Sequence, residues 1–485
     1  METRSNGLPE EGASSFMKRP LRFPASFCRQ KRVLINICCG SREAPSSQHY
    51  CAMSTIAVRF LIDRAQKRVV LAEAGSDFVD VLFSFLTLPL ASIVRLLEKQ
   101  TGLGSLDTLY ESAEQLDAEH FRTEACKEML LNPRSAAALL CEGFKLKGIH
   151  DSDPRNFFTC GENDCLTQST SYYTYNSKCL CSRCGKLMGK TWQWPQRTSA
   201  EGGIFFNDMH NFMITDDLQV IPSSLPKGLS LFKEMQIKNA SKLEERVIDF
   251  GKEEILNLLK RSFVSTNLLT DVCFPDACVQ ASAGFFLPKK DESFDNKAEQ
   301  EISLIKLILN KKNNIILYAE VGVDFINLLF SLLNFPLGAV LPAPDNLSLG
   351  GCIKNLYSSA ESMGLEYFKS EICRKMLLNP KLPAFSRCNM NQILQLEKIT
   401  SESLITGKGC LKCYLDNGYK AIGSAPCEHG IQYAQVIEWN PKSAKTMSRA
   451  DEAFVVGSQK YMILDKLDVS SLSICCWLTK VYDFR

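Results

Sequence analysis

The chain has 485 residues, with 56 Lys and Arg against 54 Asp and Glu, and a formal net charge of +2. Hydrophobic residues make up 45% and charged residues 23%, which excludes an overall disordered chain, a coiled coil or a collagen-like fibre. There are 21 cysteines, and the first residues lack the pattern of a secretory signal peptide. We therefore expect reduced thiols or metal ligands in an intracellular protein, cytoplasmic or nuclear, rather than a disulfide scaffold.

Residues 1–53 differ in composition from the rest of the chain. Basic residues, Ser and Pro dominate there, and no long apolar period is present. We expect a disordered or spurious extension. An organelle-targeting signal is the alternative, although the four glutamates of residues 1–52 depart from the acid-poor composition of a transit peptide.

The first patterned segment predicts a β-hairpin followed by a long helix. Strands rich in β-branched residues are expected at Val58–Ile62 and Arg68–Ala74. The apolar segment Phe78–Leu97 is long enough to raise the question of a membrane span. Its polar residues form one helical stripe, however, which predicts a buried helix and no membrane span. The stripe consists of Asp80, Ser84, Thr87 and Arg95, and Pro89 should kink or split the helix.

Further helices and short strands complete the first half of the chain. Helices are predicted near Leu106–Leu116 and Ala118–Leu131, with Asp117 as the N-cap of the second. A closing helix is predicted at Glu253–Arg261. Short strands are predicted at Ile204–Phe206, Phe212–Thr215 and Leu218–Ile221, with Asp216-Asp217 as a turn.

An internal repeat is the strongest pattern in the sequence. Glu73–Phe78 recurs as Glu320–Phe325, and Met129–Pro133 recurs as Met376–Pro380, with every matched pair 247 positions apart. A constant offset over such a length predicts two tandem copies of one structural unit. The second hairpin is accordingly expected around residues 304–319.

We therefore predict an α+β fold built from two tandem copies of one module. Each module would hold a β-hairpin, helices, a zinc-ribbon-like cysteine loop, short β-strands and a closing helix. Module one is expected at residues 54–280, with the charged stretch 281–300 as a linker. Module two is expected at 301–473, without its closing helix, followed by an atypical tail at 474–485.

A cluster of cysteines predicts a metal site in module one. Two closely spaced pairs on turns can surround a tetrahedral Zn²⁺ at little loop-closure cost. Four thiolates would make a closed, structural zinc site. The predicted ligands are Cys160, Cys165, Cys181 and Cys184. Cys179 could replace Cys181, and a group of free thiols on a loop is the alternative.

Module two has a weaker version of this cluster. Cys410 and Cys413 are well spaced for a metal, whereas Cys427 and His429 are a poor match for the Cys181/Cys184 turn. A zinc site there is a weaker prediction.

Several motifs in combination indicate a family. The segments are Leu61–Leu90, Cys181–Met188, Phe212–Val220 and Leu268–Val272. From about residue 54 to 473 the chain resembles the plant proteins known as domain of unknown function 674. The resemblance implies tandem copies of one module and a plant origin, and it implies no substrate.

The functional hypotheses come from three classes. The first is a zinc-stabilised module that binds a protein partner. The second is an enzyme that uses the repeated Glu73/Asp77 junction, although helix capping is the simpler explanation of those carboxylates and the common catalytic motifs are absent from the sequence. The third is a zinc-ribbon nucleic-acid binder, with Arg183, Lys186 and Lys190 beside the cysteines.

Overall fold

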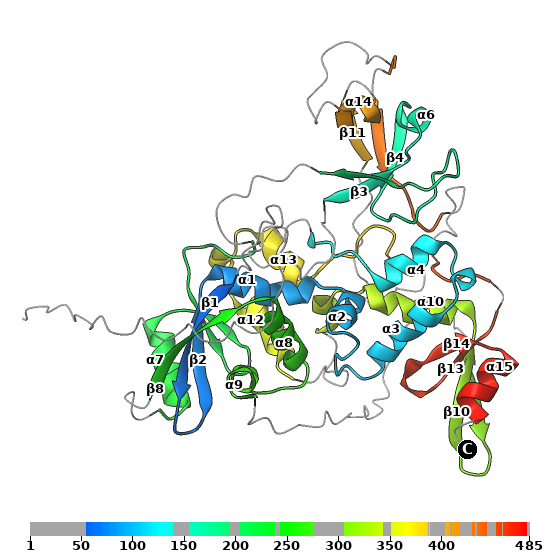
Figure 1. Cartoon of the computed structure of the whole chain (residues 1–485). Helices are drawn as coiled ribbons and strands as arrows, with labels where there is room; N and C mark the ends of the chain where they lie inside the picture. Colours follow the sequence, from blue (N-terminus) through cyan, green and yellow to red (C-terminus); the bar gives the residue numbers. More distant parts are fainter. Residues whose placement is uncertain are drawn as a thin grey trace, which may run out of the picture. The chain divides into compact units, whose positions relative to one another are not determined.

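The chain has a mixed α+β fold with three sheets in its described residues. Figure 1 shows the computed structural model. The described residues belong to one compact unit, Met53–Arg485. They are 55–138, 155–194, 204–237, 243–275, 305–342, 351–386, 388, 403–407, 410–416, 429–431, 434–443, 453–457 and 459–482. The predicted extension 1–53 and linker 281–300 lie outside them.

The first sheet is antiparallel, in the order β7-β6-β2-β1-β8. The predicted hairpin is confirmed, and the Asp63 carboxylate accepts the N–H groups of Ala65 and Gln66 in its turn. Alternate residues of β1 are buried, as expected for a strand with one core face. The strands are β1 (Ile56–Asp63), β2 (Arg68–Ala74), β6 (Phe212–Thr215), β7 (Val220–Pro222) and β8 (Leu243–Phe250).

The second sheet has four strands in the order β14-β13-β10-β9. Arg59 pairs with Glu73 across β1 and β2, and Lys306 pairs with Glu320 across β9 and β10 in the same register. The strands are β9 (Lys306–Asn310), β10 (Ile315–Val321), β13 (Tyr461–Ile463) and β14 (Val469–Ser471).

The third sheet, in the order β11-β12-β4-β3-β5, joins strands from both halves of the chain. Strand β12 runs parallel to β4, and the other strand pairs are antiparallel. The strands are β3 (Asn156–Thr159), β4 (Thr170–Thr174), β5 (Lys190–Gln193), β11 (Ser403–Gly407) and β12 (Ala434–Glu438).

The long apolar segment after β2 is split at Pro89, as predicted. It forms α1 (Ser76–Ser84), the 3₁₀ turn η1 (Phe85–Thr87) and α2 (Leu90–Leu96). The stripe residues Asp80, Ser84 and Thr87 are buried. Among the described residues, no helix has the length and apolar character needed to cross a membrane.

The remaining helices and short helical turns follow in chain order. They are α3 (Ser105–Gln115), η2 (Ala118–His120), α4 (Glu124–Leu131), α6 (Asn163–Leu166), α7 (Leu225–Glu234), α8 (Lys252–Ser262), α9 (Leu268–Cys273), α10 (Val323–Ser331), η5 (Leu332–Asn334), α11 (Leu337–Val340), α12 (Ile353–Ser362), η7 (Leu365–Tyr367), α13 (Glu371–Leu378), α14 (Leu411–Asp416), η9 (Asp465–Leu467), α15 (Ile474–Trp477) and η10 (Leu478–Tyr482).

Three local predictions were wrong in detail. The helix expected from Ala118 begins at Glu124, because Thr123 rather than Asp117 caps it and accepts the Cys126 N–H. Residues 204–206 form no strand and contribute only an isolated bridge at Phe206. Strand β7 begins at Val220, because Leu218 has a positive φ of 66° and belongs to the turn.

Both major cores combine residues from the two halves of the chain. The first packs β1, β2 and α1 with α12 and α13, and the second packs α3 and α4 with β10 and α10. The halves also meet at Pro89 and Pro336, which form an isolated bridge. There the Leu90 N–H donates to the Phe335 carbonyl at 2.9 Å, and the Leu337 N–H donates to the Leu88 carbonyl at 2.9 Å.

Two further backbone hydrogen bonds connect the halves, one donated by each half. The Lys369 N–H donates to the Phe205 carbonyl, and the Arg122 N–H donates to the Phe454 carbonyl, each at 2.9 Å. Lys369 lies 247 positions after Arg122, so each half supplies the same kind of contact to the other. The helices of one half therefore complete the core of the other half.

Candidate metal centre

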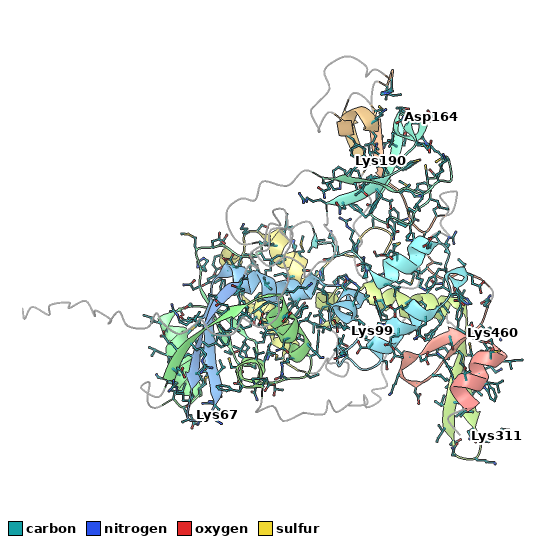
Figure 2. The ribbon with its side chains drawn as sticks, viewed as in Figure 1. Lys67, Lys99, Asp164, Lys190, Lys311 and Lys460 are labelled. Carbon is teal, nitrogen blue, oxygen red and sulfur yellow. The ribbon has the colours of Figure 1, made fainter. Side chains whose placement is uncertain are left out.

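The four predicted metal ligands come from three short segments of the third sheet. Cys160 directly follows β3, Cys165 lies on α6, and Cys181 and Cys184 lie in the turn between β4 and β5. Figure 2 labels Asp164 on α6 and Lys190 at the start of β5, which mark the two sides of this region.

The sulfur atoms of these cysteines lie together. All four Sγ atoms are within 4.8 Å of one another. The Cys160 and Cys184 sulfurs are 3.4 Å apart, and the Cys165 and Cys181 sulfurs are 3.9 Å apart. Tetrahedral coordination with metal–sulfur bonds of about 2.3 Å places sulfurs about 3.8 Å apart. The group therefore has the dimensions of a four-thiolate metal site.

The turn that carries Cys181 and Cys184 is built as a tight knuckle. The Gly185 N–H donates to the Cys181 carbonyl at 2.9 Å, and the Cys181 N–H donates to the Lys186 carbonyl at 2.8 Å. Gly185 has φ of +71°, a conformation that side chains other than glycine rarely adopt. The Lys186 N–H lowers the pKa of the Cys184 thiol, which is how a knuckle stabilises a thiolate.

Burial opposes ionisation of the thiols on the other side of the group. It raises the pKa of Cys160 to about 11, although the Glu162 N–H opposes this shift. Burial also raises the pKa of Cys165, and the neighbouring thiols add to the effect. Four ionised thiols at this spacing need a cation between them, and a divalent metal supplies that charge as it displaces the protons.

Apolar side chains cover the buried side of the group, whereas Cys184 is exposed. Ala125, Met188 and Trp439 are buried against the cysteines. Cys179 belongs to this apolar shell rather than to the group of four ligands, since its sulfur lies 3.5 Å from Thr174 Oγ1. Trp439 comes from the second half of the chain, and no sequence pattern linked it to the cysteines.

The weaker group of the second half is only partly described. The Cys410 sulfur lies 3.5 Å from His429 Nδ1. Cys413 lies on α14, but its side chain is outside the described part of the structure, as is Cys427. The described residues thus bring together two of the four predicted ligands.

The carboxylates considered for catalysis have structural partners. Glu73 forms an ion pair with Arg59 at 3.5 Å, and Glu320 pairs with Lys306 at 3.4 Å and also with Lys460, labelled in Figure 2. The N-cap of α1 is Gly75 rather than Asp77, which lies in the first turn.

The Asp216-Asp217 turn uses its carboxylates in the same structural way. Asp216 accepts hydrogen bonds from the Thr270 N–H and hydroxyl, each at 2.7 Å. Asp217 accepts one from the Thr215 hydroxyl at 2.5 Å. A third group, Asp117, Glu119 and His120, has ligand atoms within 4.8 Å of one another, with both acids exposed.

Residues 52–481 match the model of the family described as Protein of unknown function (DUF674), and the chain belongs to this family. No curated protein and no solved structure matches the chain.

Proposed function

We propose that Cys160, Cys165, Cys181 and Cys184 bind one structural Zn²⁺ in a protein that serves as an intracellular protein-interaction scaffold. The observation that carries the proposal is the convergence of the four sulfurs within 4.8 Å. Four thiolates fill a tetrahedral shell and leave no open position for substrate, so the metal would stabilise the fold rather than catalyse a reaction. The cysteine side chains that the structure describes form no disulfide, which supports a reducing compartment.

We also propose that the chain is a duplicated module. The reciprocal hydrogen bonds across the two halves and the shared strand order of the first two sheets support it. The Val220 N–H donates to Ser359 Oγ at 2.9 Å, and the Val469 N–H donates to Ser112 Oγ at 2.8 Å. Ser359 lies 247 positions after Ser112, as the repeat requires.

An exposed apolar surface supports the scaffold role. It lies on β9, β10 and the residue before β9, at the open side of the second sheet. Large exposed apolar patches on soluble proteins commonly mark binding surfaces. The patch consists of Ile305, Leu307, Leu309 and Ile316, which share one face of the hairpin and are each between 44% and 49% exposed.

The nucleic-acid hypothesis receives less support from the basic residues near the cysteines. Lys186 forms an ion pair with Glu162 at 2.7 Å. Arg183 donates to the Thr170 carbonyl at 2.6 Å. Lys190 lies over the Trp192 ring at 4.6 Å. These side chains are engaged within the protein rather than presented to phosphate groups.

Elemental analysis of the purified full chain tests the metal proposal. We expect about one zinc per chain in the wild type, and loss of that zinc in Cys181→Ser/Cys184→Ser. The matched control is Cys475→Ser/Cys476→Ser, a neighbouring pair outside the cluster, which should keep the metal. Wild-type protein without any metal, and with all four thiols freely titratable, would overturn the proposal.

The scaffold role needs a separate test. We expect a specific protein that co-purifies with the wild-type chain to be lost with Leu307→Lys/Leu309→Lys, since both charges would fall within the apolar patch. The control is Lys311→Glu, in the exposed β9–β10 turn. Equal recovery with the patch variant would remove the patch from the proposal.

A further inference from the structure

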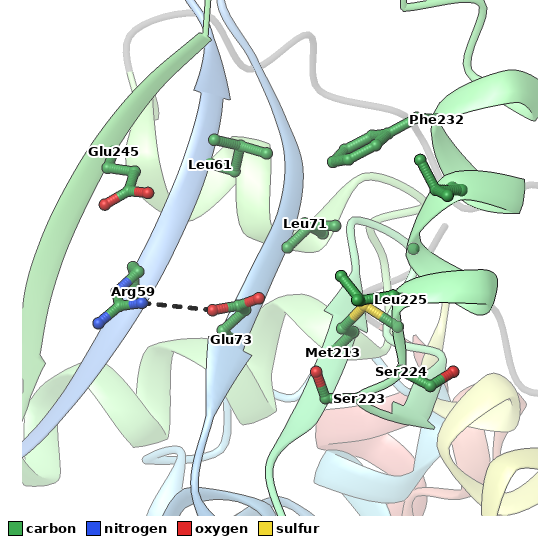
Figure 3. A pocket seen from close by; sticks show the side chains of 12 residues that line it. Arg59, Leu61, Leu71, Glu73, Met213, Ser223, Ser224, Leu225, Phe232 and Glu245 are labelled. Carbon is green, nitrogen blue, oxygen red and sulfur yellow. Dashed lines mark ion pairs between the residues drawn. The ribbon is translucent and has the colours of Figure 1, made fainter. Parts of the chain in front are cut away.

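A cavity lies between α7 and the outer face of the first sheet, well away from the cysteine group in the chain. Its volume is about 370 Å³. Cavities of about 300–1,000 Å³ are the usual size of small-molecule sites. Figure 3 shows its walls, which come from β1, β2, β6, β8 and α7.

The body of the cavity is apolar. Leu61, Leu71 and Met213 form its floor on the sheet, and Phe232 of α7 closes one side. An amphipathic helix normally buries its apolar stripe. Helix α7 has no buried residue, however, and Leu225 and Leu229 on the cavity wall are 86% and 60% exposed. The stripe is thus available to cover an apolar guest.

Gly228 keeps the helix wall open at the centre of the cavity. A Cβ atom built there would lie 3.6 Å from the Met213 sulfur, an ordinary contact distance. A large side chain at this position would therefore extend into the space above Met213 and fill it.

The charged residues gather at the end of the cavity opposite Phe232 (Figure 3). Arg59 and Glu73 form an ion pair at 3.5 Å and neutralise each other. Glu245, next to them on β8, has no ion pair or hydrogen bond from its carboxylate to a described residue. The charged end therefore carries one negative charge in excess, which favours a cationic group and disfavours an anionic one.

We propose that this cavity binds a small amphiphile that has an apolar body and a single cationic amine. The apolar body would lie between Leu71, Met213 and Phe232, and the amine would lie against Glu245. The site is independent of the metal centre and of the scaffold role.

Displacement of a neutral fluorescent probe, N-phenyl-1-naphthylamine, tests the proposal on the full chain. Decylamine, decanol and decanoate share a chain length and differ in the charge of the head group. We expect decylamine to displace the probe at a concentration about tenfold below decanol, with decanoate weakest. Equal midpoints for the three compounds, a preference for decanoate, or no probe binding would each overturn the proposal.

Two variants locate the site. Glu245→Gln should remove the preference for decylamine over decanol. Glu244→Gln is the matched control, because this neighbouring carboxylate pairs with Arg64 and is not part of the cavity lining. Gly228→Phe should abolish displacement by all three compounds while the circular dichroism spectrum and melting curve stay unchanged. Unaltered displacement in a folded Gly228→Phe protein would place the binding elsewhere and overturn the assignment.

Discussion

In each half of the chain, a side chain at the same position of a buried helix accepts backbone N–H groups from a segment much later in the sequence. The two halves use different side chains for this contact. In the first half, the buried Asp80 carboxylate accepts the N–H groups of Ile204, Phe205 and Phe206. In the second half, the residue 247 positions later is Asn327. Its Oδ1 accepts the N–H groups of Phe454 and Val455, at 2.8 and 2.9 Å.

The amide of Asn327 also donates, which a carboxylate does not do. Its Nδ2 donates to the Val323 carbonyl at 3.1 Å and to the Val455 carbonyl at 3.0 Å. A neutral amide therefore holds its segment without burying a charge. Asp80 makes the same anchor with an ionisable group, and burial raises the pKa of its carboxyl to about 7. One local geometry can therefore be either pH-sensitive or pH-insensitive, depending on the side chain that forms it.

Four sulfurs converge in the cysteine group of the first half, so metal removal should give the largest effect. Chelation, or Cys181→Ser, should expose the amides of β3 and β4 to hydrogen exchange, because structural zinc contributes roughly 10 kcal/mol to the folding of small sites. Cys410→Ser should leave these amides protected. Of the other three ligands predicted for that group, His429 is the one that the structure describes beside Cys410. Hydrogen exchange followed by mass spectrometry distinguishes the two; equal exposure would mean that both groups hold the sheet.

Removal of the anchors themselves should come next in size. Asp80→Ala leaves two buried N–H groups and the half-buried N–H of Ile204 without their acceptor, and should lower the free energy of unfolding by about 4 kcal/mol. Asn327→Ala should cost about 3 kcal/mol by the same reasoning. Urea unfolding measures both.

The control for the anchor variants is Asp249→Ala. Asp249 is exposed on β8, so a cost below about 0.5 kcal/mol is expected. A small cost for Asp80→Ala as well would show that water replaces the carboxylate, and the anchor would then contribute little.

Local sequence patterns predicted the hairpins, the helix break at Pro89 and the spacing of the four cysteines, because each of these depends on neighbours in the chain. The stripe containing Asp80 was correctly read as one polar face of a buried helix. Its role was not visible, since the three N–H groups it accepts lie more than 120 positions away. Likewise, no local pattern places Trp439 beside the cysteines.

Strand β8 shows why an edge strand is hard to recognise. Its sequence contains Glu244, Glu245 and Arg246 in a row, which reads as a solvated segment. The strand forms because its backbone pairs with all of β1, from Ile56 opposite Phe250 to Asp63 opposite Leu243. Charges on an exposed edge also discourage pairing with other chains. The cavity beside this strand is a tertiary feature with no sequence signal of its own.

The pH dependence of the free energy of unfolding should also distinguish the two anchors. An unfolded Asp has a pKa near 3.9, whereas burial raises the folded pKa of Asp80 to about 7 despite the attraction of Lys369. Between these pH values the folded protein binds more protons than the unfolded one. The stabilising contribution of Asp80 is therefore complete below about pH 4 and is lost as the pH rises to about 7.

Asp80→Asn should therefore remove this component, and the stability of the wild type should fall relative to that of the variant as the pH rises. Asn327→Asp should introduce a comparable dependence into the second half. Urea unfolding from about pH 4 to about pH 7 measures both slopes, and the other titrating groups cancel in the differences. A flat difference for Asp80→Asn would mean that its three N–H donors fully offset the effect of burial.

The smallest predicted effects test whether the two halves are equivalent where their residues are identical. Ser112 and Ser359 each accept a backbone N–H from the opposite half, from Val469 and Val220 respectively. Both serines are buried, so replacement by Ala should leave one unpaired N–H group and cost about 1–2 kcal/mol in each case. Urea unfolding of the two single variants and the double variant measures the costs and their sum.

Equal and additive costs would show that Ser112 and Ser359 hold the halves together through two independent contacts of the same strength. A double cost well below the sum would instead show that the two contacts cooperate, so that loss of one already releases the other. Costs that differ by more than about 1 kcal/mol would mean that the two halves have diverged in packing even where sequence and hydrogen bonding agree. The strength of a contact in one half would then not predict the strength of the matching contact in the other half.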